Sequence, residues 1–288
     1  FFIIFLSIII YFLNEDKLKN NFVTFEFFTK EGSILINNWF IMYFLAVILV
    51  GTIYPIFLEV LTNQKISVGP PFFNKLIIPF LIPFLIFMSI GPNLSWIKTN
   101  EFKKKIYAFV FFLVNIILAF FLLNIFGREN LILTILLGAS FYLFFTTLRD
   151  ILKKKIINLS QKISHFGFSL LVLSIIFNAI LSKEITTNLR VGQEINFNNN
   201  KIKFEKIEIK QISNYKQLIS YFTMHDKKKT IIFNPEIRIY NQPEVMTSEA
   251  DIKTNLFKDR FLVINLIKND DEYFNVRYQE KPFMIWIW

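Results

Sequence analysis

The stretch QKISHFGFSLLVLSIIFNAILS at residues 161–182 decides the fold of this chain. It is apolar along most of its length and is long enough for a helix that crosses a bilayer. It also carries His165, the one histidine found in any of the chain's membrane-length apolar segments. The stretch therefore predicts a membrane-spanning helix with an imidazole inside it.

On such a helix, His165 shares a face with Phe168, Ser169, Val172 and Ile176. Because burying an unpaired imidazole costs on the order of a few kcal/mol, His165 needs a partner. The aromatic and apolar wall suits the edge of a heme whose iron His165 binds. It equally suits a packed helix interface with a hydrogen-bonded histidine, so the pattern alone leaves both interpretations open.

The composition places most of the chain in a membrane, since 53% of its residues are hydrophobic. Phe, Ile, Asn and Lys have AT-rich codons, so the 37 Phe residues indicate nucleotide bias of an organelle genome, and aromatic clusters carry little functional information. The absence of Cys excludes thiolate ligands and a cysteine nucleophile within the chain. The net charge of +10 does not indicate nucleic acid, because the Lys residues lie mainly in short loops between spans.

The apolar runs predict further complete spans at about 34–61, 75–96, 106–126 and 131–148, and partial spans at 1–13 and 282–288. We expect Pro55 to kink or end its helix, and the loop 62–74, with Gly69-Pro70-Pro71, not to be regular helix. We expect both ends of the chain to continue elsewhere. The predicted transmembrane helical domain is 1–182.

The loops 14–33, 97–105 and 149–162 hold most of the Lys and Arg of the short loops, including the run at 153–155. The positive-inside rule places these loops on the inner side of the membrane. The loops 62–74 and 127–130 and the segment 183–281 then face the outside, and His165 lies in the inner half of the membrane.

Segment 183–281 predicts a small β-rich domain. Phe274, Val276 and Tyr278 alternate with polar residues, and the apolar residues of 202–209 alternate with a one-residue slip that indicates a bulge. His225, in a Lys-rich turn at 224–230, predicts a solvated loop rather than a metal site. The pair Glu205 and Glu208 is more simply strand surface than acid–base machinery. The predicted fold is a polytopic α-helical membrane protein of about six to seven transmembrane helices, the terminal ones partial, with this small soluble domain. Residues 282–288 are predicted to start the final transmembrane helix.

Several separated strings resemble the C-terminal half of CcmF, the heme lyase component of system I cytochrome c maturation, and they occur in one order along nearly the whole chain. Specific examples are SVGPPFFN at 67–74, SHFG at 164–167 and PEIRIY at 235–240; the others are EGSILINN at 31–38, GTIYP at 51–55, GP at 91–92, TSEADIK at 247–253, DRFLVI at 259–264 and KPFMIWIW at 281–288. In several mitochondrial lineages this family is split into N- and C-terminal proteins. The resemblance therefore implies the C-terminal part of a split version, in an inner mitochondrial membrane with the β domain in the intermembrane space.

This family attaches heme to apocytochrome c by joining the heme vinyl groups to the thiols of a CxxCH motif. Its members hold a transmembrane b-type heme between two membrane histidines, and His165 of SHFG matches the more C-terminal one. The resemblance thus implies that His165 is an axial ligand of heme b, with bis-imidazole ligation favouring electron transfer. It implies no catalytic residue within this chain.

The family's tryptophan-rich segment, the two external histidines flanking it and the first membrane histidine are absent from this sequence. The resemblance therefore implies an N-terminal CcmF-like partner that carries them, together with a heme chaperone, apocytochrome c and membrane lipid as partners. An alternative is a non-catalytic structural or assembly subunit of a larger inner-membrane complex, with His165 hydrogen-bonded. A transporter is a weaker interpretation, since no half-helix pair or buried acidic site indicates a substrate path.

Glu236 and Arg238, two apart on a strand, predict a polar network more than a contact with a heme propionate. For SVGPPFFN, a rigid turn and a heme-handling contact remain equally open.

Overall fold

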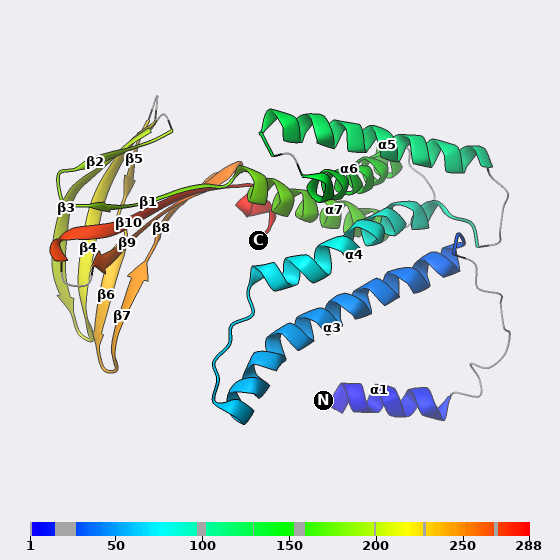
Figure 1. The fold of residues 1–288 in the computed structure, drawn as a ribbon, viewed down its shortest axis with the longest axis horizontal. Coiled ribbons are helices and arrows are strands. Elements are labelled where there is room, and N and C mark those ends of the chain that lie inside the picture. Colours follow the sequence, from blue (N-terminus) through cyan, green and yellow to red (C-terminus); the bar gives the residue numbers. More distant parts are fainter. Residues whose placement is uncertain are drawn as a thin grey trace. The chain divides into compact units, whose positions relative to one another are not determined.

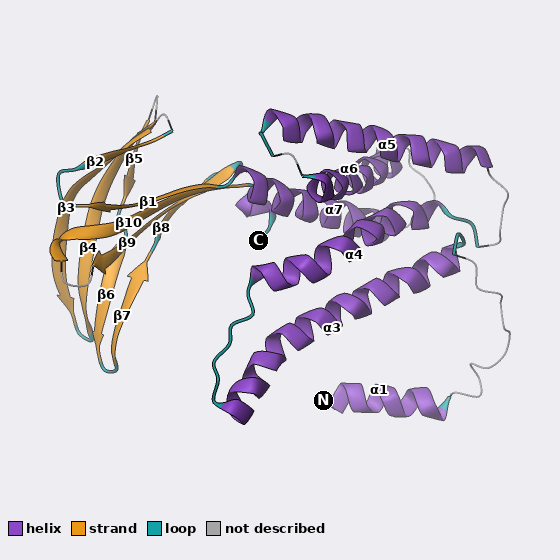
Figure 2. Ribbon diagram, in the orientation of Figure 1, coloured by secondary structure: helices purple, strands orange, loops and turns teal. Residues whose placement is uncertain are grey.

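The structure is a computed structural model that describes residues 2–14, 27–96, 102–128, 130–152, 159–198, 200–226, 229–267 and 270–288. The chain forms two compact units, 1–113 and 114–288. Helices make up the described chain as far as Leu181, and strands predominate from Lys183 onward (Figures 1 and 2). The run 153–155 and most of the predicted inner loops 14–33 and 97–105 lie outside the described residues.

The first unit contains α1 (Phe2–Leu13), α3 (Lys30–Thr62), α4 (Pro70–Ile90) and the 3-10 turn η1 (Gly91–Asn93). Thr29 caps α3, because its Oγ1 accepts a 3.1 Å hydrogen bond from the N–H of Gly32. α3 and α4 pack together, and the hydroxyl of Tyr43 on α3 donates to the carbonyl of Leu76 on α4 at 3.1 Å. A polar tyrosine tip is thus satisfied between two apolar helices.

Two proline expectations for this unit are wrong in part: residues 70–74 of the loop 62–74 are helical, and Pro55 does not end its helix, while a kink at Pro55 stays a prediction. Helix α4 begins at Pro70, inside the loop that was expected to be irregular, because proline lacks an N–H that the first helical turn does not need. Gly69 provides the extended residue before it. Pro55 does not end its helix either, since α3 continues to Thr62.

The second unit begins within α5 (Phe102–Ile125) and continues with α6 (Leu131–Leu152) and α7 (Leu159–Leu181). Gly138 of α6 lets α5 approach closely: a Cβ built there would lie 2.8 Å from Cγ1 and 2.9 Å from Cα of Ile116. On the other side of α6, the rings of Phe144 and Phe166 lie 5.3 Å apart and join α6 to α7. Small residues and aromatic pairs are common means of packing membrane helices.

Five described helices are long and apolar enough to cross a membrane: α3, α4 with η1, α5 from Ile106, α6 and α7. These are the five complete spans that the sequence predicts. α1, with 12 residues, is shorter than a span. Together with the strands described next, the helices confirm the predicted class, a polytopic helical membrane protein with a small β-rich domain.

Ten strands form two antiparallel sheets (Figure 2). One sheet has the order β1-β10-β9-β8 and the other β2-β3-β4-β6-β7, with β5 paired to β4. The bounds are β1 (Lys183–Leu189), β2 (Glu194–Phe197), β3 (Asn200–Ile212), β4 (Tyr215–Asp226), β5 (Lys229–Phe233), β6 (Glu236–Asn241), β7 (Glu244–Glu249), β8 (Asp251–Thr254), β9 (Lys258–Ile267) and β10 (Asp270–Pro282).

The two sheets enclose one apolar core. Phe204 stacks on Phe222 within one sheet at 4.3 Å and meets Phe274 of the other sheet edge-on at 5.8 Å. Phe274, Val276 and Tyr278 are all buried, as their alternation predicts. The predicted bulge is also present, because the β3–β4 register shifts between Phe204 and Lys206.

After β10, Met284–Trp286 form a short 3-10 turn, η2, that follows Phe283 in the left-handed region at φ 59°. A final membrane span beginning at 282 therefore stays a prediction, and so do the proposed limits of the membrane and β domains.

The close contact at Gly138 yields a stability prediction. Gly138→Ala should lower the free energy of unfolding by about 1–3 kcal/mol, because its Cβ meets the backbone of Ile116 and the helices must move apart. Thermal unfolding of the full chain in detergent measures this.

Gly167→Ala on α7 is the matched control, since a Cβ there meets nothing within 4 Å. This variant should be neutral or slightly stabilising through its better helix propensity. Equal destabilisation by both substitutions would contradict the role assigned to Gly138.

Candidate functional site

His165 lies near the start of α7, about 9 Å along the axis from Leu159 at 1.5 Å per residue. The face that it shares is the packed face of the helix. Ser169, Val172 and Ile176 on this face are buried. His165 itself is half-buried, at the end of the face where coverage by the rest of the unit runs out.

The imidazole has an arrangement that fits an axial ligand. Its Nδ1 atom is enclosed by protein while the ring as a whole is half-covered. An iron ligand needs one ring nitrogen set in the protein and the other directed to the metal. The neighbouring Ser169 does not compete for this position, since its hydroxyl donates to the carbonyl of Phe166 at 2.7 Å. His165 as an axial heme ligand therefore stays a prediction, since an enclosed Nδ1 is compatible both with that role and with a packed helix interface.

The second histidine does not complete that site. His225 lies on β4 in the sandwich, is exposed, and places Nδ1 3.2 Å from Oγ1 of Thr230, its partner in the β4–β5 ladder. Among the described residues, no three His, Asp or Glu side chains gather where they could hold a metal ion. Within the part of the chain that the structure describes, His225 therefore supplies no second imidazole beside His165.

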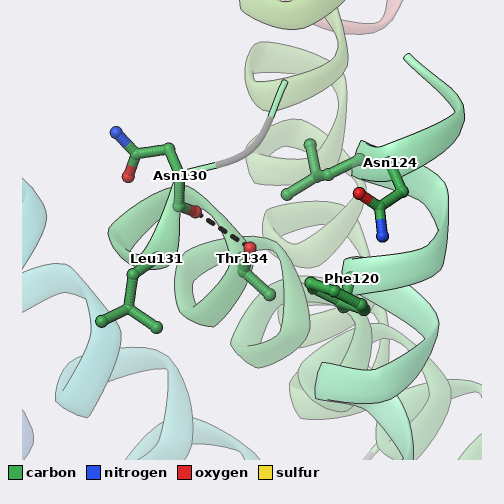
Figure 3. A pocket seen from close by; sticks show the side chains of 6 residues that line it. Phe120, Asn124, Asn130, Leu131 and Thr134 are labelled. Atoms are coloured by element: carbon green, nitrogen blue, oxygen red, sulfur yellow. Dashed lines mark hydrogen bonds between the residues drawn. The ribbon is translucent and has the colours of Figure 1, made fainter. Parts of the chain in front are cut away.

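A hollow of about 270 Å³ lies between the end of α5 and the start of α6 (Figure 3). Phe120 and Asn124 line it from α5, and Leu131 and Thr134 from α6. The hydroxyl of Thr134 donates to the carbonyl of Asn130 at 2.9 Å. The hollow is smaller than most small-molecule sites, which measure roughly 300–1,000 Å³, and His165 does not line it.

Glu236 and Arg238 lie side by side on β6, on one face as expected. Both Nε and Nη2 of Arg238 donate to Oε2 of Glu236, at 3.1 and 2.9 Å. The Glu236 hydrogen bond raises the pKa of Arg238, which also stacks over the ring of Tyr215 at 5.4 Å. The guanidinium is thus engaged within the domain, and contact with a heme propionate stays a prediction.

Glu205 and Glu208 each belong to a small network on the strand surface. Oε2 of Glu205 pairs with Nζ of Lys203 at 2.9 Å, and its Oε1 accepts from the hydroxyl of Thr223 at 2.7 Å. Glu208 accepts from Lys206 and Tyr221. Hydrogen bonds from the two lysines lower the pKa of both carboxyl groups, so neither is arranged to donate a proton near neutral pH.

Four of the quoted strings pair up within the first unit through small residues. Gly51 of GTIYP leaves room for Phe73 of SVGPPFFN, since a Cβ at Gly51 would lie 2.8 Å from the Phe73 ring. Gly91 of the GP string contacts the hydroxyl of Ser33 of EGSILINN. These contacts give the strings a packing role between α3, α4 and η1. A contact of SVGPPFFN with heme remains untested.

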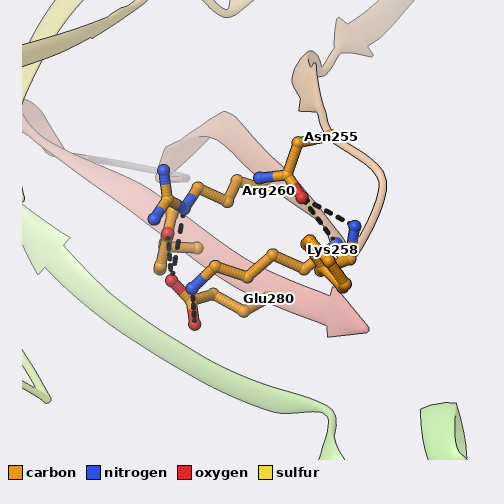
Figure 4. Close-up of polar contacts among 6 residues, drawn as sticks. Asn255, Lys258, Arg260 and Glu280 are labelled. Carbon is orange, nitrogen blue, oxygen red and sulfur yellow. Dashed lines mark hydrogen bonds and ion pairs between the residues drawn. The ribbon is translucent and has the colours of Figure 1, made fainter. Parts of the chain in front are cut away.

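Sequence reasoning missed a buried charge cluster in the second unit (Figure 4). Glu280 binds Nζ of Lys258 at 2.9 Å through Oε2, and its Oε1 lies 3.4 Å from Nε of Arg260 and accepts from the hydroxyl of Tyr278 at 2.9 Å. Arg260 and Glu280 are only 8% and 9% exposed. Such a cluster is tolerated because the charges are paired and Glu280 also accepts hydrogen bonds from Lys258 and Tyr278.

The signal for this cluster is present in the strand pattern. Arg260 has the same inward phase as Leu262 and Ile264, and Glu280 has that of Tyr278. The antiparallel register sets Arg260 directly opposite Glu280. An inward-facing charge at the end of each of two adjacent strands could have indicated a buried pair.

Comparison with known proteins agrees with this architecture. The profile of the CcmF C-terminal beta-sandwich matches residues 180–282, which are the ten strands and their connections. A cytochrome c-type biogenesis protein CcmF of Pseudomonas fluorescens is 26% identical over 92% of this chain, and the CcmF of Escherichia coli K12 is 22% identical over 98% of it. The chain is thus similar to CcmF proteins along nearly its whole length, and its strands carry the CcmF C-terminal beta-sandwich.

A solved structure, "Cytochrome c Heme Lyase CcmF", has the same fold as this chain. The two superpose with a TM-score of 0.69 over 91% of this chain, at 17% identity. The chain spans less than half of the length of these relatives: 42% of the P. fluorescens protein, 45% of the E. coli protein and 44% of the solved chain. The activity, substrates and partners of the whole relatives therefore do not follow for this chain from the match alone.

The buried cluster of this CcmF-like chain yields a second prediction. Glu280→Gln should destabilise the chain by about 3 kcal/mol or more, because it leaves the buried Arg260 and the neighbouring Lys258 without a counter-charge. Thermal unfolding of the full chain in detergent measures the loss.

Glu184→Gln is the control. Glu184 also pairs with an arginine, Arg277, at 2.9 Å, but both side chains are about half exposed, and solvent screens such a pair. Its loss should change the unfolding temperature little. A Glu280→Gln variant as stable as Glu184→Gln would show that the buried cluster contributes nothing.

Proposed function

We propose that this chain is the C-terminal part of a cytochrome c heme lyase that works together with an N-terminal CcmF-like partner. The complex attaches heme to apocytochrome c by forming thioether bonds between the heme vinyl groups and the thiols of a CxxCH motif. The observation that carries the proposal is His165: a CcmF-like chain places one half-buried imidazole on the packed face of a membrane-capable helix. A heme chaperone would deliver the heme.

Within that complex, His165 serves as one axial ligand of a transmembrane b-type heme. Such a heme, ligated by two imidazoles, passes single electrons and can keep the heme to be attached in its reduced state. The chain's own contribution is to hold the imidazole in place. The α6–α7 contact through Phe144 and Phe166 supports the helix, and the Nδ1 side of the ring is enclosed by protein.

The proposal includes a partner chain, because this sequence has two histidines and only one of them lies in a described membrane-capable helix. The partner would bring the second axial imidazole, the tryptophan-rich segment and its flanking histidines. Gly167, two residues after His165, supports close approach of another surface, since a Cβ there meets nothing within 4 Å. The glycine of the SHFG string thus has open space beside it, whereas Gly51 and Gly91 of the other strings are packed against neighbours in the first unit.

The proposed location is the inner mitochondrial membrane, with the sandwich in the intermembrane space. The support is the charge distribution of the short loops, which places segment 183–281 on the side opposite the Lys-rich loops. His165 then lies in the inner half of the membrane, at the start of α7.

The decisive experiment is the visible spectrum of the native complex purified through this chain. His165→Ala should remove the reduced-minus-oxidised b-type signal and the pyridine hemochrome, because the iron loses an axial ligand, while the thermal unfolding of the chain is unchanged. In His165→Gly, added imidazole should restore the signal, which a merely structural histidine would not allow.

His225→Ala is the control and should keep the full heme content, since His225 is exposed in the sandwich. A His165→Ala complex with unchanged absorbance would refute the ligand assignment. Mass spectrometry of the copurified chains should also reveal one that carries the tryptophan-rich segment.

A second candidate function is a non-catalytic structural or assembly subunit of a larger inner-membrane complex. What favours it is the position of His165, whose Nδ1 is enclosed by protein on the packed face of α7, as expected of a histidine at a helix interface. The same spectrum separates the two: a complex with all its chains intact and no heme supports the structural subunit.

A further inference from the structure

The turn between β8 and β9 exposes two large apolar side chains, Leu256 at 61% and Phe257 at 72%. The turn is nonetheless well ordered by hydrogen bonds, because Oδ1 of Asn255 accepts from the N–H groups of Phe257 and Lys258, both at 2.9 Å (Figure 4). Polar residues usually occupy the tips of such turns. Apolar side chains held in a fixed exposed position are typical of a contact surface.

This turn is joined to a second exposed apolar segment that follows β10. The N–H of Phe283 donates to the carbonyl of Phe257 at 2.8 Å, and the indole N–H of Trp286 donates to the carbonyl of Leu256 at 3.0 Å. Ile285, Trp286 and Trp288 are 43%, 47% and 91% exposed. We call the five residues Leu256, Phe257, Ile285, Trp286 and Trp288 the apolar tip.

The apolar tip is fixed to the end of a membrane-capable helix. The side-chain amide of Asn178, in the last turn of α7, donates to the carbonyl of Pro282 at 2.7 Å, and the rings of Phe177 and Phe283 lie 5.7 Å apart. A single residue separates the end of α7 from the start of β1. Because a spanning helix must leave the hydrocarbon near its end, the tip lies at the depth of the membrane surface.

The chemistry of the tip matches that depth. Tryptophan is enriched where membrane and water meet, since its ring is apolar and its N–H is polar. Basic side chains lie beside the tip: Lys183 is exposed, and Lys281 sits 5.0 Å above the ring of Phe261. Lysines at this level can reach anionic lipid headgroups while apolar neighbours enter the acyl region.

We propose that the apolar tip inserts into the lipid bilayer beside the end of α7 and holds the β-sandwich against the membrane surface. The occupant of this surface is lipid. The sandwich is thereby fixed at two places, through the covalent link from α7 to β1 and through the β8–β9 turn. This assignment does not depend on heme binding or on lyase activity, because it rests only on α7 crossing the membrane.

The chain has no Cys, so a single introduced thiol can be labelled selectively. The full chain carrying Phe257→Cys is labelled with a bimane fluorophore and reconstituted in vesicles of phosphatidylcholine and phosphatidylglycerol. Quenching is measured with phospholipids spin-labelled near the headgroup and with aqueous iodide. Ser213→Cys in the exposed β3–β4 turn is the matched control, and Leu256→Cys repeats the test should Phe257→Cys unfold.

The label at 257 should be quenched by the spin-labelled lipid, and its iodide quenching constant should be several-fold lower than at 213. The label at 213 should show the reverse. Strong iodide quenching at 257 without lipid quenching would overturn the proposal, because the tip would then lie in water. Protection from both quenchers would also overturn it, since a protein surface rather than lipid would cover the tip.

Discussion

One hydrogen bond joins the membrane part of the second unit to its sandwich: the Asn178 amide on α7 donates to the carbonyl of Pro282 at the end of β10, 104 residues later in the chain. The oxygen of the same side-chain amide accepts from the hydroxyl of Ser182 at 3.3 Å. Pro282 has no backbone N–H to donate to a neighbouring strand, so its backbone can form a hydrogen bond only through the carbonyl. The bond holds the end of β10 against the last turn of α7, the helix that β1 follows.

The arrangement at this end of the sandwich follows from that junction. β10 pairs with both β1 and β9, so Glu280 lies opposite Lys183 on one side and Arg260 on the other. A carboxylate surrounded by basic side chains in an otherwise apolar sandwich is stabilised only when all these strands keep their register. The β8–β9 turn and the segment after Pro282 are placed by the same strands, and with them the apolar tip.

His165 lies where the packing of α7 changes along the helix. The contacts of α6 with α7 cover the face from Ser169 to Ile176, and coverage fades at His165. At Gly51, Gly91 and Gly138, neighbours from the same unit occupy the space that a Cβ atom would need. At Gly167 a Cβ atom would meet nothing within 4 Å. The start of α7 is thus less covered by the described part of its unit than the middle of the helix.

The sequence by itself determined the class of the protein, its five complete spans, the β-rich segment and the position of the β3 bulge, because hydrophobic length and the period of two are local properties. It also identified His165 as the membrane histidine and the resemblance to CcmF proteins through ordered strings. Tertiary structure alone decided that Pro70 starts a helix, that Arg260 meets Glu280, and that Leu256 and Phe257 are held beside the end of α7. These features depend on which residues distant in the chain become neighbours, and pairing between strands and helices sets that rather than any local pattern.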